Sequence, residues 1–173
     1  MADHVAQHHP DVVWACPALP ASPARAMADI EALCVDWPRA STVVMGSSLG
    51  GFYATVLAQA WGVRAVLLNP AVQPHTHGDV LVGEFPMWHD AGQTMVFTPA
   101  FLDELAALDP GALRSPQQLL TIVARGDEVL DAGQLEAYYA QTRLHAFDGG
   151  DHALSDFARW LPLIDAFLQE PHV

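Results

Sequence analysis

TVVMGSSLGG, residues 42–51, is the stretch of sequence that decides the fold. The apolar, β-branched run at 42–46 predicts a strand, and the pattern at 50–61 predicts a helix. Between them, Gly46-Ser47-Ser48-Leu49-Gly50 fits G-x-S-x-G, a sharp strand-to-helix turn that holds a serine in strained backbone geometry. Small residues are expected there because a Cβ on either side of the serine would clash. The stretch therefore predicts a nucleophile elbow with Ser48 as the nucleophile.

The rest of the chain alternates apolar runs with helical patterns, which is typical of a parallel sheet covered by helices. Besides 42–46, we expect strands at 11–16 (DVVWAC), 64–69, 119–124 and 144–147. We expect helices at 22–36, capped by Ser22 with Pro23 at N1, and at 100–108, 131–141 and 154–169. Pro162 should kink or split the last helix. The prediction is an α/β protein with a mostly parallel sheet and helices on both faces, forming a single domain over residues 1–173.

Residues 72–99 differ from the rest of the chain. They contain three Pro, three Gly and three His, with scattered aromatic residues. We expect a long irregular connection over the sheet edge that acts as a lid-like insertion, since long loops in compact domains are usually functional. Trp88 within it either lines an acyl pocket or anchors the loop.

A serine hydroxyl needs a base, and the base needs an acid that fixes its tautomer. In the α/β-hydrolase fold the acid follows the serine in the chain, and the histidine comes last. Asp127 follows the expected strand at 119–124 and is the first candidate for the acid, with Asp131, which can instead cap a helix, as the second and Glu128 as the third. His152 follows the last expected strand and is the candidate base. The predicted catalytic residues are therefore Ser48, Asp127 and His152.

The helix that follows Ser48 contributes to the expected site as well. Its N-terminus carries the positive end of the helix dipole, which favours a developing oxyanion. The backbone N–H of Leu49 is the expected oxyanion donor.

Charge and composition disfavour several classes of protein. The formal net charge is −13 with only seven Lys and Arg residues, which argues against binding to nucleic acid or anionic membranes. No apolar run approaches the ~18 residues of a membrane span, and residues 1–10 lack the regions of a signal peptide. Cys16 and Cys34 show no metal spacing, so we expect free thiols. We therefore expect a cytoplasmic protein whose partner is a small-molecule substrate; the oligomeric state is not readable.

The histidines outside the expected triad form two groups. His75 and His77 make an H-x-H pair, and His4, His8 and His9 cluster near the start of the chain. A metal site needs at least one more converging ligand in a fixed geometry. We therefore expect solvated loop histidines, no metal and no cofactor.

Several blocks of the sequence together resemble one bacterial family, the small α/β-hydrolase esterases of the YqiA/YcfP type. The blocks are HHPDV at 8–12, PALP at 17–20, VMGSSLGGFYAT at 44–55, LNPAVQP at 68–74, RGDEVLD at 125–131 and GGDHAL at 149–154. The resemblance implies that Ser48 is the nucleophile, Asp127 the acid and His152 the base. It further implies hydrolysis of acyl esters or acyl-CoA thioesters, without indicating a physiological substrate.

The sequence departs from that family at its N-terminal end. Members of the family begin with an apolar strand and a His-Gly-Phe-Asn-Ser-type loop, and this sequence has no such segment. By the resemblance, the strand would lie between those at 11–16 and 42–46, and its loop would supply a second oxyanion donor. Such a contact contributes about 2.7–4 kcal/mol to catalysis. We hypothesise that the reading frame continues upstream of Met1.

Three functions are compatible with these residues. The first is hydrolysis of an acyl ester or thioester through an acyl-enzyme. The second is a catalytically impaired binding protein on a hydrolase scaffold. The third is an acyltransferase, which differs from a hydrolase only in whether water or another acceptor reaches the acyl-enzyme.

Overall fold

The computed structural model describes residues 1–86, 92 and 94–170. Its centre is a sheet of four parallel strands in the order β1-β2-β5-β6. The strands are β1 (Val43–Ser47), β2 (Arg64–Leu68), β5 (Leu119–Ala124) and β6 (Arg143–Phe147). Every residue of β2 and β5 is buried, as expected for parallel strands that are covered on both faces. The predicted strands at 42–46, 64–69, 119–124 and 144–147 are thus confirmed, with small shifts at their ends.

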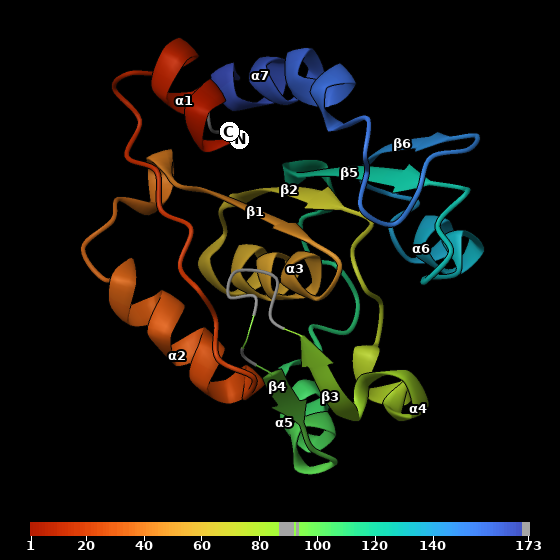
Figure 1. The fold of residues 1–173 in the computed structure, drawn as a ribbon. Coiled ribbons are helices and arrows are strands. Elements are labelled where there is room, and N and C mark those ends of the chain that lie inside the picture. The colour runs from red at the N-terminus through yellow and green to blue at the C-terminus, as the bar shows by residue number, and fades with distance from the viewer. Residues whose placement is uncertain (87–91, 93, 171–173) are drawn as a thin grey trace.

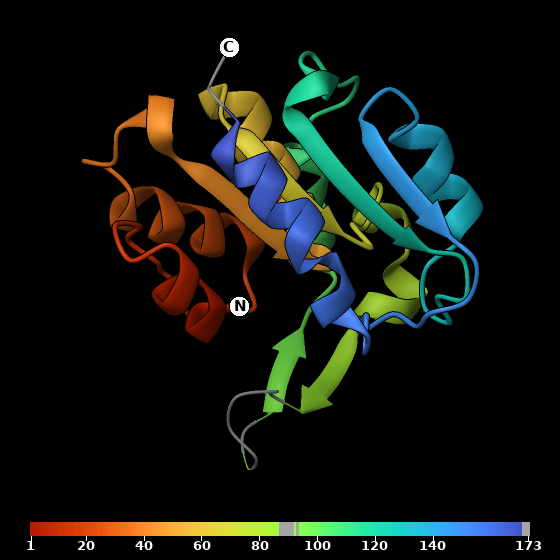
Figure 2. The same cartoon turned by 90° about the horizontal axis from the view of Figure 1, so that it is seen from above.

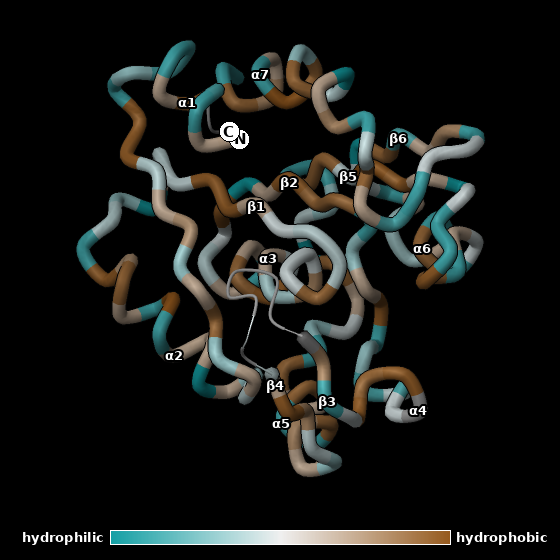
Figure 3. The backbone as a smooth tube through the Cα atoms, in the orientation of Figure 1, coloured by the Kyte–Doolittle hydropathy of each residue, from teal (hydrophilic) through white to brown (hydrophobic). Residues whose placement is uncertain are grey.

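Helices cover both faces of the sheet (Figure 1). One layer contains α2 (Pro23–Leu33), α3 (Leu49–Trp61) and α6 (Ala132–Tyr138), and the other contains α1 (Ala2–His8) and α7 (Leu161–Gln169). Apolar residues of α3 and α6 form one buried cluster with the sheet, and Ile164 and Phe167 of α7 form another with strand residues. Figure 3 shows the hydrophobic residues concentrated along the central strands and the helix sides that face them. Within the described residues, no helix combines the length and the apolar character needed to span a bilayer.

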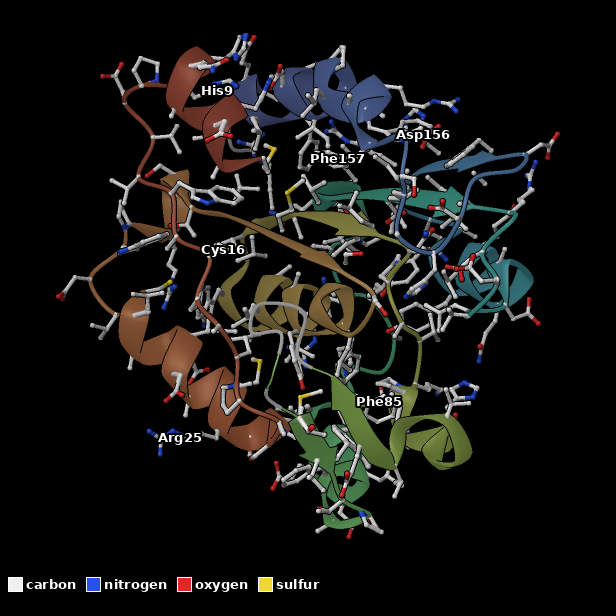
Figure 4. The ribbon with its side chains drawn as sticks, viewed as in Figure 1. His9, Cys16, Arg25, Phe85, Asp156 and Phe157 are labelled. Carbon is white, nitrogen blue, oxygen red and sulfur yellow. The ribbon has the colours of Figure 1, made fainter. Side chains whose placement is uncertain are left out.

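Three helix predictions change in detail. The helix predicted over 131–141 is α6, which ends at Tyr138. Ser22 caps α2 by accepting a hydrogen bond from the Arg25 N–H, as expected, but α2 ends at Leu33 rather than near 36. The helix predicted over 154–169 is split into a 3-10 turn, Phe157–Trp160, and α7. Pro162 lies in the first turn of α7, where its missing N–H costs nothing. Phe157 lies between α7 and the sheet (Figure 4).

The predicted strand at 11–16 is wrong. The segment forms no ladder with the sheet, and Val12, Val13 and Trp14 are 55%, 75% and 38% exposed. The physical reason is that a strand requires a hydrogen-bonded neighbour, and this segment does not pair with β1, the edge strand on this side of the sheet. A groove of about 690 Å³ lies between this segment and β1. The groove is lined mainly by apolar side chains, and the apolar residues of this segment form part of that lining.

Residues 72–99 contain more regular structure than we expected. After a 3-10 turn (Pro74–Thr76) and α4 (Gly78–Leu81), β3 (Gly83–Pro86) pairs antiparallel with β4 (Thr94–Phe97). Figure 2 shows this strand pair projecting beyond the body of the protein. The following α5 (Ala100–Leu108) matches its predicted bounds. Trp88 lies outside the described residues, and the lid function stays a prediction.

Candidate active site

Ser48 lies between the end of β1 and the first residue of α3. Its backbone has φ 54° and ψ −122°. A residue with a side chain adopts this positive-φ conformation only under strain. The strain is held by local hydrogen bonds, because the Ser48 N–H donates to the Leu68 carbonyl and the Ser48 carbonyl accepts from Gly51. The local geometry is that of the predicted nucleophile elbow.

The glycines around Ser48 differ in how much space their surroundings leave for a side chain. A Cβ on Gly46 would overlap the backbone carbonyl of Gly50, and a Cβ on Gly51 would lie 2.8 Å from Pro70 Cα. Outside its chain neighbours and the backbone of its own helix, a Cβ on Gly50 would meet no described atom within 4 Å. The expected steric reason therefore holds at Gly46 and Gly51 but is wrong at Gly50.

This difference provides a matched pair of variants. Gly46→Ala is expected to destabilise the protein by about 3 kcal/mol or more, because backbone atoms of α3 must move away from the new methyl group. Gly50→Ala is expected to be neutral or stabilising by up to about 1 kcal/mol, since alanine favours a helix over glycine. Urea denaturation of both variants measures the difference. Equal denaturation midpoints for the two variants would contradict the role of close packing at this turn.

His152 connects Ser48 with Asp127 through both of its ring nitrogens. Nε2 lies 2.9 Å from Ser48 Oγ, and Nδ1 lies 2.8 Å from Asp127 Oδ2. Since the Asp127 carboxylate can only accept, Nδ1 carries the proton and Nε2 faces the serine hydroxyl as an acceptor. The three residues that the sequence analysis selected are thus brought together in one hydrogen-bonded chain.

Burial and hydrogen bonds fix the orientation of the Asp127 carboxylate beside the His152 ring. Its side chain is fully buried, and its Oδ1 accepts the backbone N–H groups of Val129 and Leu130, both at 2.8 Å. These bonds leave Oδ2 directed at His152. The carboxylate is therefore oriented by the backbone that follows β5.

The alternative acids have other roles. Asp131 caps α6 by accepting from the N–H groups of Gly133 and Gln134. Glu128 accepts the backbone N–H of His152 at 3.0 Å and does not contact its ring. Of the three candidates, only Asp127 contacts an imidazole nitrogen of His152.

Two adjacent glycines position the loop that carries His152. Gly149 and Gly150 have φ of +75° and +77°, which favour glycine. A Cβ on Gly150 would also lie 2.8 Å from the ring of Phe147. Asp151 directly precedes the histidine, and hydrogen bonds from Ser155, which follows it, hold the pKa of the Asp151 carboxyl below its ordinary value. The turn after His152 is thereby fixed.

Asn69 is a residue that the sequence analysis missed. It is fully buried at the end of β2, and its Nδ2 donates to the carbonyls of Asp151 and His152, both at 3.1 Å. Its Oδ1 accepts the N–H of Ala124 at 2.8 Å. One side chain thus ties together the ends of two strands and the histidine loop. The available sequence signal was an Asn-Pro pair directly after a buried strand.

Leu49 is the first residue of α3, where backbone N–H groups have no partner within the helix. This placement fits the expected oxyanion donor. Within the described residues, we assign no second donor.

The other predicted features have mixed outcomes. Cys16 and Cys34 are free thiols, as expected. His75 Nδ1 is 3.9 Å from Asp109 and joins no larger cluster of possible ligands within the described part of the chain. The prediction of solvated loop histidines is wrong for His4 and His9, whose side chains are mostly buried against α7.

Comparison with known proteins places the chain in a family. The model of the uncharacterised protein family UPF0227 matches residues 1–169. The chain belongs to the UPF0227 family. This match covers nearly the whole sequence and confirms the family resemblance.

Solved structures similar to this UPF0227 chain are α/β hydrolases. A putative hydrolase from Agrobacterium vitis S4 is 18% identical with a TM-score of 0.65, covering 84% of this chain and 68% of its own. Mouse α/β hydrolase domain-containing protein 10 is 17% identical, with a TM-score of 0.60 and the same coverage. The esterase domain of a Rhodothermus marinus protein is 20% identical, with a TM-score of 0.58 and coverage of 87% and 68%. At these identities the likeness shows the fold, and it confirms the predicted α/β-hydrolase fold.

Proposed function

We propose that the protein hydrolyses carboxylic acyl esters or thioesters through an acyl-enzyme on Ser48. The observation that carries this proposal is the chain of hydrogen bonds from Ser48 through His152 to Asp127 at 2.9 and 2.8 Å. It occurs on a strained elbow at the end of a parallel strand, which is where α/β hydrolases present their nucleophile. The esterase domain among the similar structures supports a small ester as the substrate.

The geometry supports a two-stage mechanism. His152 Nε2 takes the proton of Ser48 Oγ as the oxygen attacks the substrate carbonyl, and the Leu49 N–H stabilises the oxyanion. The protonated His152 then gives the proton to the leaving alcohol or thiol. Water, activated by the same histidine, cleaves the acyl-enzyme and regenerates Ser48. Asp127 stabilises the imidazolium in both stages and fixes the tautomer that can act as a base.

The reaction class is tested with two substrate series. Acyl esters and acyl-CoA thioesters of matched acyl chains are incubated with the protein, with and without alcohol or amine acceptors, and the products are identified by mass spectrometry. The proposal predicts free acid as the main product under both conditions. Acyl transfer in preference to hydrolysis would favour an acyltransferase, and no turnover of either series would favour a binding protein.

One observation keeps the impaired binding protein as a second candidate. The oxyanion site has one assigned donor, Leu49, in the described residues, and a missing donor costs about 2.7–4 kcal/mol of transition-state stabilisation. The corresponding loss in kcat is about 10²–10³-fold. Acyl-enzyme formation on Ser48 distinguishes a slow enzyme from a binding protein, because a binding protein forms none.

Asn69 is proposed as a positioning residue for His152. Asn69→Ala removes the two donors that hold the carbonyls of Asp151 and His152, so the imidazole is free to move away from Ser48. We expect kcat to fall about 10- to 100-fold with little change in KM, because the substrate pocket itself is intact. Gln73→Ala is the matched control, since Gln73 also has a positive φ but its side chain is exposed. Equal kcat values in the two variants would contradict the role of Asn69.

A further inference from the structure

α1 and α7 come from opposite ends of the chain and pack side by side over one face of the sheet (Figure 1). α1 buries Val5, and Met1 packs against the apolar cluster that includes Ile164 and Phe167 of α7. These apolar contacts alone would let α1 slide or rotate, because they have no fixed direction. The polar contacts between the helices therefore determine how α1 is placed.

Three side chains form these polar contacts. His4 Nε2 lies 2.9 and 3.0 Å from the two carboxylate oxygens of Asp165, and His9 Nε2 lies 2.9 Å from Oδ1 of the same carboxylate. Figure 4 shows His9 on the side of the protein where α1 and α7 meet. One ligand atom from each residue can be chosen so that all three lie within 4.8 Å of one another.

Local backbone geometry brings the two histidines together. Residues five apart on a regular helix lie on different faces, so a continuous α1 would separate their rings. α1 ends at His8, and His9 has φ −136° and ψ 62°, outside the helical region. This break lets the His9 ring turn back to the carboxylate that His4 contacts. The His8 ring stacks on His4 at 4.3 Å between centroids and further fixes the orientation of that ring.

The cluster has the chemistry of a transition-metal site. Two imidazole nitrogens and one carboxylate are ligands that zinc uses in proteins, and three protein ligands leave one coordination position for water. Zinc bonds of about 2.0–2.1 Å in tetrahedral geometry place ligand atoms about 3.3 Å apart. The histidine–aspartate contacts at 2.9–3.0 Å would therefore need to open by only a few tenths of an ångström. The side chains retain 13–24% exposure, so both an ion and a water molecule have access.

We propose that His4, His9 and Asp165 bind a zinc ion that clips α1 to α7. The ion replaces the hydrogen bonds of the two Nε2 atoms to the carboxylate, and each ring then carries its proton on Nδ1. The ligands are 156 and 161 residues apart, so the ion links the two ends of the chain. Because His9, Met1 and Val5 also line the groove beside β1, the clip fixes one wall of that groove.

The test uses the full chain without an affinity tag, treated with a chelator and then dialysed. Zinc chloride is titrated into it by isothermal calorimetry, and the thermal midpoint is measured with and without zinc. We expect one zinc ion per chain and a higher midpoint with zinc, because a ligand that binds only the folded state stabilises it. Asp165→Asn and His9→Gln are each expected to weaken zinc binding at least 10-fold and to abolish the shift in midpoint.

His77→Gln is the matched control, because it removes one histidine of the other pair and should bind zinc like the wild type. Circular dichroism of each variant without zinc establishes that it is folded, and His9→Gln serves if Asp165→Asn does not fold. Absence of saturable zinc binding by the wild type would overturn the proposal. Wild-type affinity in both ligand variants would overturn it as well.

Discussion

Ser48→Ala is expected to lower kcat for a short-chain aryl ester by about 10³- to 10⁶-fold while KM stays nearly unchanged. The reason is that alanine removes the attacking oxygen but leaves the fold, the pocket and His152 in place. Steady-state release of the aryl alcohol measures the effect. A kcat within 10-fold of the wild type would contradict the assignment of Ser48 as the nucleophile.

Ser47→Ala is the matched control for this variant. Ser47 is the neighbouring residue, carries the same side chain and is exposed at the end of β1. Within the described part of the chain its side chain forms no hydrogen bond with His152. We therefore expect its removal to leave kcat within about 2-fold of the wild type, as for ordinary surface substitutions. A loss in Ser47→Ala equal to that in Ser48→Ala would show that the turn, rather than the Ser48 hydroxyl, is being disturbed.

Asp127→Asn is expected to lower kcat by about 10⁴-fold. The asparagine amide would present an N–H to His152 Nδ1, so Nδ1 would accept and the ring proton would move to Nε2. The imidazole would then face Ser48 with a donor and be unable to take its proton. Steady-state kinetics across pH, together with a denaturation curve to verify folding, measure this effect.

Asp131→Asn and Glu128→Gln are the controls, because Asp131 and Glu128 were the alternative acids. Each keeps an oxygen that can accept the backbone hydrogen bonds seen in the structure. For Asp131→Asn we expect kcat within about 5-fold of the wild type, because this side chain is separated from the imidazole. For Glu128→Gln we expect a moderate loss of kcat, because Glu128 accepts a hydrogen bond from the backbone N–H of His152. A larger loss in either control than in Asp127→Asn would reassign the acid.

The three residues of the proposed triad were predictable from the sequence because their signals are local. The elbow combines an apolar strand, small residues and a helix start within residues 42–51, and each part depends on its neighbours in the chain. Asp127 and His152 both follow the ends of apolar runs. In a parallel sheet the carboxyl ends of the strands meet at one edge, so residues that follow these strands come together.

Other features depend on contacts between distant residues. The run at 11–16 has the composition of a strand, but composition does not supply a neighbouring strand, and here it lines a groove. β3 and β4 were missed because Pro86 and the glycines of the segment indicated a loop, although a two-stranded ribbon tolerates proline at a strand end.

The roles of Asn69 and Asp165 were also invisible in the sequence. Asn69 acts on a loop 82–83 residues further along the chain, and nothing near it in sequence indicates that contact. Asp165 is one acidic residue in an amphipathic helix until the fold places it against His4 and His9. From the sequence alone, no further ligand could be shown to converge on these histidines in a fixed geometry, so we expected no metal.

The most direct test of the central claim is reaction of the folded chain with a fluorophosphonate, followed by intact-mass measurement and peptide mapping. A fluorophosphonate reacts with a serine that a neighbouring base has activated. The account predicts one adduct per chain, on Ser48, that is absent in Ser48→Ala and strongly slowed in Asp127→Asn. No adduct on the folded wild-type chain, or an adduct on a serine other than Ser48, would contradict it.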